Sequence, residues 1–137
     1  MSLRYLLDTN VVSEPVRSRP SPSLMARLER EAAVCAISSV VLHELRYGCV
    51  RMPPSDRRRA FEEYVVGVAS RLPVLDYDAS AAAWHAEERA RLEGKGKTPT
   101  FVDGMIAAVA AVRGLTLVTR DRRGFTGFRG VEIESWD

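Results

Sequence analysis

The chain has 137 residues, with 20 Lys or Arg against 18 Asp or Glu and a formal net charge of +2 at pH 7. This length predicts a single domain, residues 1–137, with a core large enough to fold without disulfides or a structural metal. Because the charges nearly cancel, net charge alone does not indicate a nucleic-acid-binding protein. No apolar run approaches the ~20 residues that a membrane span requires, and no signal peptide is recognisable, so we expect a cytoplasmic protein without membrane contact.

Short apolar runs alternate with longer amphipathic segments along the chain. This alternation is typical of β-α units around a mostly parallel sheet. Strands are predicted near residues 4–7, 34–37, 72–75, 115–118 and 131–134. Helices are predicted over residues 21–32, 38–48, 55–70, 78–94 and 103–112, the second of them ending at Gly48. Cys35 and Cys49 belong to no Cys-x-x-Cys or Cys/His cluster, and we expect both to be reduced and structural.

Four carboxylates fall where the carboxyl edge of this sheet should lie. Asp8 ends the first strand, Asp121 follows the strand at 115–118, and Asp103 opens a helix that should begin at the same edge. Glu44 lies roughly 9 Å into its helix, so that helix would have to tilt across the crevice to bring Glu44 to the others.

Each of these acids also has a purely structural explanation. Asp8 could cap a short helix that follows it, and Asp103 could form a capping box with Thr100. Glu44 could be an exposed polar residue of its helix, and Asp121 could be a turn residue. Their shared edge favours a common function for all four.

A cluster of carboxylates points to a metal ion. Two like charges ~4 Å apart repel by about 4 kcal/mol at an effective dielectric constant of ~20, so such a cluster needs protons or a cation. Oxygen ligands without His or Cys favour Mg²⁺ or Mn²⁺. We expect His43 and His85 to be structural. A hard cation in a crevice flanked by arginines suits phosphodiester hydrolysis, since it activates water and neutralises phosphate charge.

At these residues the sequence resembles the PIN-domain nucleases, and specifically the VapC-like toxins of type II toxin-antitoxin systems. Four stretches carry the resemblance in order: YLLDTNVVSE, SSVVLHELRYG, PTFVDGMIAAVA and LVTRDRRGF. The resemblance implies a three-layer α/β/α sandwich on a central, mostly parallel sheet. It also implies an endoribonuclease that depends on Mg²⁺ or Mn²⁺, forms a homodimer, and is inhibited by a small VapB-like antitoxin whose tail fills the active-site groove.

The resemblance assigns roles to individual residues. The family's catalytic and metal-binding acids carry over onto Asp8, Glu44, Asp103 and Asp121. Thr9 and Asn10 resemble residues that orient Asp8, and Thr119 holds the equivalent place beside Asp121. Arg120 and Arg122 are candidates for contact with RNA phosphates, with simple surface charge as the alternative.

The last acidic position departs from the family pattern. Many members have an acid just before the Phe of the final stretch, whereas this chain has Asp121 earlier and Gly124 before Phe125. The resemblance therefore supports Asp121 least among the four acids.

Two other function classes remain as alternatives. A catalytically inactive PIN-fold module that binds RNA or protein would keep the fold and lack competent metal sites. A phosphotransfer enzyme with Asp8 as nucleophile would want a second aspartate two residues later, where this chain has Asn10, and a receiver module would want a lysine at a late strand end.

Overall fold

Five short strands form the centre of the molecule. The computed structural model describes residues 2–137, and its strands lie in the order β3-β2-β1-β4-β5. They are β1 (Tyr5–Leu7), β2 (Cys35–Ser38), β3 (Val74–Leu75), β4 (Thr116–Val118) and β5 (Ile133–Glu134). Every neighbouring pair is parallel. The carboxyl ends of all five strands therefore meet at one edge.

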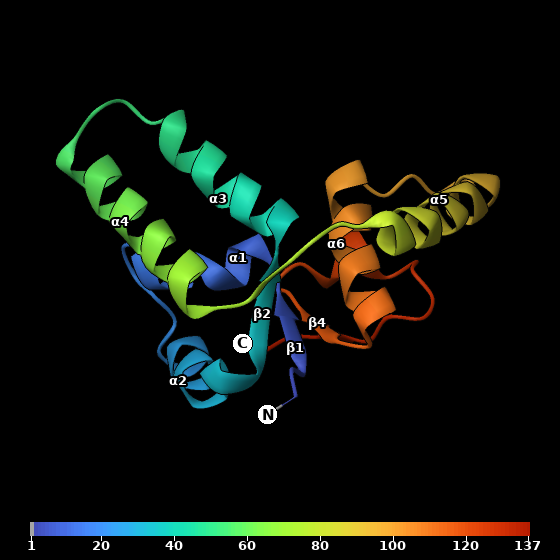
Figure 1. Ribbon diagram of the computed structural model, residues 1–137, viewed down its shortest axis with the longest axis horizontal. Helices are drawn as coiled ribbons and strands as arrows, with labels where there is room; N and C mark the ends of the chain where they lie inside the picture. Colours follow the sequence, from blue (N-terminus) through green and yellow to red (C-terminus); the bar gives the residue numbers. More distant parts are fainter. Residues whose placement is uncertain (1) are drawn as a thin grey trace.

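Helices cover both faces of this sheet. They are α1 (Thr9–Val12), α2 (Pro22–Glu31), α3 (Ser39–Val50), α4 (Asp56–Arg71), α5 (Ala79–Gly94) and α6 (Phe101–Arg113), with 3₁₀ turns at Glu14–Val16, Ala32–Val34 and Arg122–Phe125. Figure 1 shows α5 and α6 on one side of the strands and α1, α2 and α4 on the other. The fold is thus a three-layer α/β/α sandwich.

The central strands are buried on both faces because both faces carry helices. Tyr5, Leu6 and Leu7 are all buried, and Ile37 and Leu117 in the neighbouring strands have no exposed surface. An uninterrupted apolar strand is what a parallel sheet covered on both sides requires. This packing explains why β1 has no polar residue before Asp8.

The helix boundaries follow their caps, and two predicted boundaries were wrong. Thr100 accepts a hydrogen bond from the Asp103 N–H at 3.1 Å, so α6 begins at Phe101 and not at Asp103. The helix α3 continues through Gly48 to Val50. A glycine ends a helix where it takes a positive φ, as Gly114 does at 68° after α6, and Gly48 does not.

The helix α3 lies across the carboxyl edge of the sheet. It contacts α1, which belongs to one helical layer, and α6, which belongs to the other. This course is the tilt that Glu44 needs in order to approach the strand ends. Across residues 2–137 no helix is long and apolar enough to cross a membrane.

The two cysteines are buried and free of disulfides. Burial raises the pKa of the Cys35 thiol to about 12, with the Glu31 carboxylate adding to the rise. The thiol of Cys35 therefore stays protonated and packs as a small apolar group.

Candidate functional site

Asp8 lies at the centre of the carboxyl edge, where β1 ends and α1 begins. Its Oδ1 accepts a hydrogen bond from the Thr9 N–H at 2.8 Å, and its Oδ2 accepts one from the Thr119 hydroxyl at 2.8 Å. Its own N–H donates to the Val118 carbonyl at 2.9 Å. From β1 the chain continues to β2, towards one edge of the sheet, and from β4 it continues to β5, towards the opposite edge. Asp8 therefore lies where the strand order reverses, which is the place where open α/β sheets bind ligands.

The environment of Asp8 disfavours its ionised form. Burial raises the pKa of this carboxyl, and the hydrogen bonds from Thr119 and Thr9 offset the rise only in part. The carboxylates of Asp121 and Glu44 raise the pKa further. A cation beside Asp8 would relieve both causes, because it would neutralise the buried charge and the repulsion between the acids.

The pKa of Asp103, in the first turn of α6, is also raised. Burial is the largest cause of its raised pKa, and the carboxylates of Asp8, Asp121 and Glu44 add to it, while Thr100 acts in the opposite direction. Asp8 and Asp103 therefore lie within electrostatic reach of each other and of both Glu44 and Asp121. The structural explanations for Asp8 and Asp103 also hold, since each takes part in a helix cap.

Three of these acids line an open hollow of about 470 Å³. Its lining is Asp8, Thr9, Asn10, Ser13, Glu44, Tyr47, Gly48, Arg51, Val102, Asp103 and Ile106. Asp121 is exposed and does not line this hollow. The fourth acid is thus on the rim of the site.

Gly124 lies against the carboxylates of both Asp103 and Asp121. A Cβ at Gly124 would lie 2.7 Å from Asp103 Oδ2 and 3.6 Å from Asp121 Oδ2. Any larger residue there would displace the Asp103 carboxylate, since 2.7 Å is far inside van der Waals contact. The departure from the family pattern at Gly124 therefore makes room for the Asp103 carboxylate.

The residues fit a hard divalent cation by their chemistry. Among residues 2–137, no group of three His, Cys, Asp or Glu side chains is already placed to hold a metal ion. The donors that meet here are nevertheless all carboxylates, and burial and mutual repulsion raise the pKa values of Asp8 and Asp103. Binding Mg²⁺ or Mn²⁺ would draw these carboxylates together.

The three residues expected to support the acids lie in different places. Thr119 connects two of the acids, because its hydroxyl donates to Asp8 and accepts from the Asp121 N–H at 3.0 Å. Thr9 reaches Asp8 through its backbone N–H. The side chain of Asn10 accepts from the Arg120 N–H at 3.2 Å and so ties α1 to the segment after β4.

Arg120 is occupied by two carboxylates of the protein. It pairs with Glu14, and its Nε donates to Asp137 at 2.7 Å. This arrangement favours a structural role for Arg120, whereas Arg122 is exposed. Glu14 is a buried acid that the sequence reasoning missed, and it also accepts from the Ser21 N–H at 2.6 Å. Its only signal in the sequence is its place at the end of YLLDTNVVSE.

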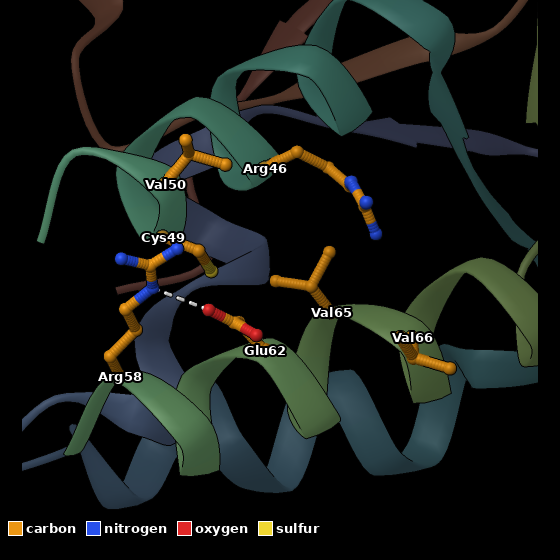
Figure 2. A pocket seen from close by; sticks show the side chains of 7 residues that line it. All are labelled: Arg46, Cys49, Val50, Arg58, Glu62, Val65 and Val66. Atoms are coloured by element: carbon orange, nitrogen blue, oxygen red, sulfur yellow. Dashed lines mark hydrogen bonds and ion pairs between the residues drawn. The ribbon is translucent and has the colours of Figure 1, made fainter. Parts of the chain in front are cut away.

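A second hollow lies between α3 and α4 and holds none of the four acids. Figure 2 shows Cys49 and Arg46 of α3 facing this gap, beside an ion pair in which Arg58 Nε lies 2.6 Å from Glu62 Oε1. Arg58 also donates to the Met52 carbonyl at 2.9 Å. These contacts stabilise the turn between α3 and α4. At 100° a residue, Arg46 and Cys49 lie on the face of α3 opposite Glu44.

Comparison with known proteins assigns the chain to a family. The model of the family described as PIN domain matches residues 5–131. The chain is 37% identical over 134 residues to the tRNA(fMet)-specific endonuclease VapC of Shigella flexneri, covering 98% of each chain. It is 34% identical over 134 residues to ribonuclease VapC2 of Haemophilus influenzae, again covering 98% of each. The chain is a PIN domain of the VapC family.

Solved structures of other PIN domains share the fold. DNA-bound VapBC from Salmonella typhimurium superposes with a TM-score of 0.87 and 36% identity over 98% of this chain and 99% of that one. VapBC2 from Rickettsia felis, bound to a DNA fragment from its promoter, gives 0.85 and 32% identity over the whole of both chains. These likenesses confirm the three-layer α/β/α sandwich, with a sheet that is parallel throughout.

Proposed function

We propose that this PIN domain is a metal-dependent endoribonuclease toxin that an antitoxin inhibits. The observation that carries the proposal is the meeting of Asp8, Glu44, Asp103 and Asp121 at the carboxyl edge, with Asp8 at its centre. Ribonuclease activity is supported by relatives that are named ribonucleases and match this chain over nearly its full length.

The proposed roles follow from the position of each acid. Asp8, Glu44 and Asp103 line the hollow and would hold Mg²⁺ or Mn²⁺, and Asp121 would complete the site from its rim. When bound, the cation would lower the pKa of a water molecule and neutralise charge on the attacked phosphate. Thr119 and the Thr9 N–H each donate a hydrogen bond to the Asp8 carboxylate and so restrict its orientation in the site.

A small antitoxin is the proposed partner. Support comes from relatives whose solved structures are VapBC complexes. This chain also offers an open apolar groove of about 970 Å³ beside α2 and α4, and an apolar segment of a partner could cover it. The homodimer implied by the sequence resemblance stays a prediction, to be measured as the mass of the purified toxin in solution.

The alternative is a PIN-fold module that binds RNA or protein without cutting. The gathering of four acids argues against it, since helix capping explains Asp8 by itself, whereas carboxylates that repel one another at a shared edge call for a cation. The two functions differ in one observable property. A binding module leaves RNA intact with or without divalent metal.

Cleavage of a mixed pool of structured RNAs by antitoxin-free protein tests the proposal. The reactions contain Mg²⁺, Mn²⁺ or a chelator, and Asp8→Asn is compared with Asp56→Asn, whose side chain is 97% exposed outside the hollow. We expect metal-dependent cuts from the wild type and Asp56→Asn and none from Asp8→Asn. Cuts that persist in chelator, or full activity of Asp8→Asn, would contradict the proposed metal site.

A further inference from the structure

The hollow beside the acids has an aromatic side chain on its rim. Tyr47 follows Glu44 by three residues on α3, and both line the same hollow as Asp8 and Asp103. Tyr47 is 54% exposed, although burying a ring of this size would add to stability. An exposed aromatic ring directly beside reactive carboxylates is placed where a substrate would touch it.

Two further planar groups lie near this ring, one helical turn before it and one after it in the sequence. The ring of His43 lies 6.2 Å from that of Tyr47, with an angle of 13° between the planes. The guanidinium carbon of Arg51 lies 5.4 Å from the centre of the Tyr47 ring. All three side chains are exposed. We call the row of His43, Tyr47 and Arg51 the α3 ladder.

Arg51 brings positive charge into a hollow lined by acids. It lines the hollow with Glu44 and Asp103, and it forms no ion pair within the part of the chain that the structure describes. A guanidinium that is not neutralised by a protein carboxylate can pair with a phosphate. The hollow therefore offers acids for a cation, a cationic group for a phosphate, and a planar surface between them.

A second exposed pair of this kind shows what is particular to the ladder. Phe101 is 50% exposed, with the Arg89 guanidinium 5.0 Å from its ring centre. This pair lines a different hollow, which holds none of the four acids, and Arg89 is paired with Glu93 at 3.2 Å. Phe101 and Arg89 therefore serve as matched controls for Tyr47 and Arg51.

We propose that the α3 ladder is the binding surface for an unpaired base of the RNA substrate next to the cleaved bond. The base stacks against Tyr47, and Arg51 binds an adjoining phosphate. Stacking on aromatic rings and guanidinium planes is the common way in which proteins hold unpaired bases. This inference rests on the proposed ribonuclease function and adds the residues that hold the substrate in register with the acids.

The test measures RNA binding in a protein that cannot cleave. In the Asp8→Asn background, a single-stranded RNA oligonucleotide carrying one 2-aminopurine is titrated, because stacking on a ring quenches this fluorophore. Tyr47→Leu should abolish the quenching and weaken binding about tenfold, as expected for the loss of one stacked base. Tyr47→Phe should keep both, and Phe101→Leu should match the parent.

The phosphate contact has its own readout. The slope of log affinity against log salt concentration should fall by about 0.7 in Arg51→Gln, the value for one phosphate contact with a single strand. Arg89→Gln removes the same charge elsewhere and should leave the slope unchanged.

The possible outcomes separate this inference from the proposed function. If Tyr47→Leu binds and quenches like the parent while Asp8→Asn abolishes cleavage, the proposed role of the α3 ladder is wrong and the proposed ribonuclease function is supported. If Tyr47→Leu changes only the mass of the toxin in solution, the ladder is a protein contact and the inference is overturned. If the wild type neither binds nor cuts any RNA, both proposals fail.

Discussion

Asp8 shows how one residue serves the site at a cost in stability. Its pKa is raised in the folded protein, chiefly by burial and further by Asp121 and Glu44. The unfolded chain has the ordinary carboxyl pKa near 4, so the folded state binds the proton more tightly. Stability is therefore lost as the pH rises from about 4 through the folded pKa, and the loss is complete above the folded pKa.

Asp8→Asn should for this reason be more stable than the wild type in the absence of divalent metal. The amide keeps the shape and has no charge to bury. We expect a higher melting temperature for the variant at pH 7 and no difference below pH 4, where Asp8 is protonated in both states. Thermal melts in chelator at several pH values measure this. A variant that melts lower than the wild type at pH 7 would show that the hydrogen bonds from Thr119 and Thr9 outweigh the buried charge.

Gly124→Ala should reduce cleavage while the fold persists. The new Cβ would lie 2.7 Å from Asp103 Oδ2, and the end of that side chain can move aside at little cost in stability. A displacement of about 1 Å in a catalytic group costs roughly a hundredfold in rate. Gly94→Ala is the control, because a Cβ there meets nothing within 4 Å, and it should keep full activity. Rates of RNA cleavage and melting temperatures of both variants check the prediction.

Among the elements, the link from the α1–α2 connection to the end of β4 depends on one buried acid. Glu14 is 1% exposed and joins the start of α2, through Ser21, to Arg120 after β4. Arg120 in turn reaches Asp137 at the end of the chain. This link fixes the segments that carry Asp8 and Asp121 relative to each other.

Glu14→Ala should lower the free energy of unfolding by about 2–3 kcal/mol. Breaking a buried ion pair costs most when the partner is left uncompensated, whereas Arg120 keeps Asp137 and is partly exposed, which places the loss at the lower end of the usual range. Glu14→Gln still accepts from the Ser21 N–H and should lose less. Glu93→Ala, which breaks a pair exposed on both sides, should change stability by less than about 1 kcal/mol. Urea unfolding of the three variants provides the comparison, and equal losses in all three would show that burial of Glu14 contributes nothing.

The elements themselves were predictable because their signals are local. Apolar runs, serine and aspartate caps, and the Pro22 start of α2 all lie within a few residues of the boundary they set. The predicted end of α3 was wrong because it relied on a local signal alone, the glycine at position 48. A glycine ends a helix only if the following chain turns away, and the continuation of α3 to Val50 is decided by what comes after Gly48.

At the scale of the whole molecule, metal and protons should compete for the same carboxylates. Burial and the surrounding acids raise the pKa values of Asp8 and Asp103, so protonation should inhibit cleavage at a pH above the ordinary carboxyl range. More Mg²⁺ or Mn²⁺ should move this acid limb to lower pH, since bound metal favours the ionised form. The pH profile of cleavage at several metal concentrations measures the shift, and an acid limb that is independent of metal would contradict the shared site.

Metal should also stabilise the whole fold. A ligand that binds only the native state raises the free energy of unfolding by about 2.7 kcal/mol at a hundred times its dissociation constant. The melting temperature of the wild type should therefore rise with Mn²⁺, and that of Asp8→Asn should not. An equal rise in both would place the metal somewhere other than beside Asp8.

The sequence by itself determined the fold class and the edge on which the acids lie. Alternating strands and helices permit few topologies, and residues at strand ends and helix starts then share one edge. Only the tertiary structure decided how the acids are held. Thr119 reaches Asp8 across 111 residues of sequence, Arg120 reaches Glu14 across 106, and α3 contacts both helical layers. Such contacts depend on the packing of distant segments, which no local pattern of residues encodes.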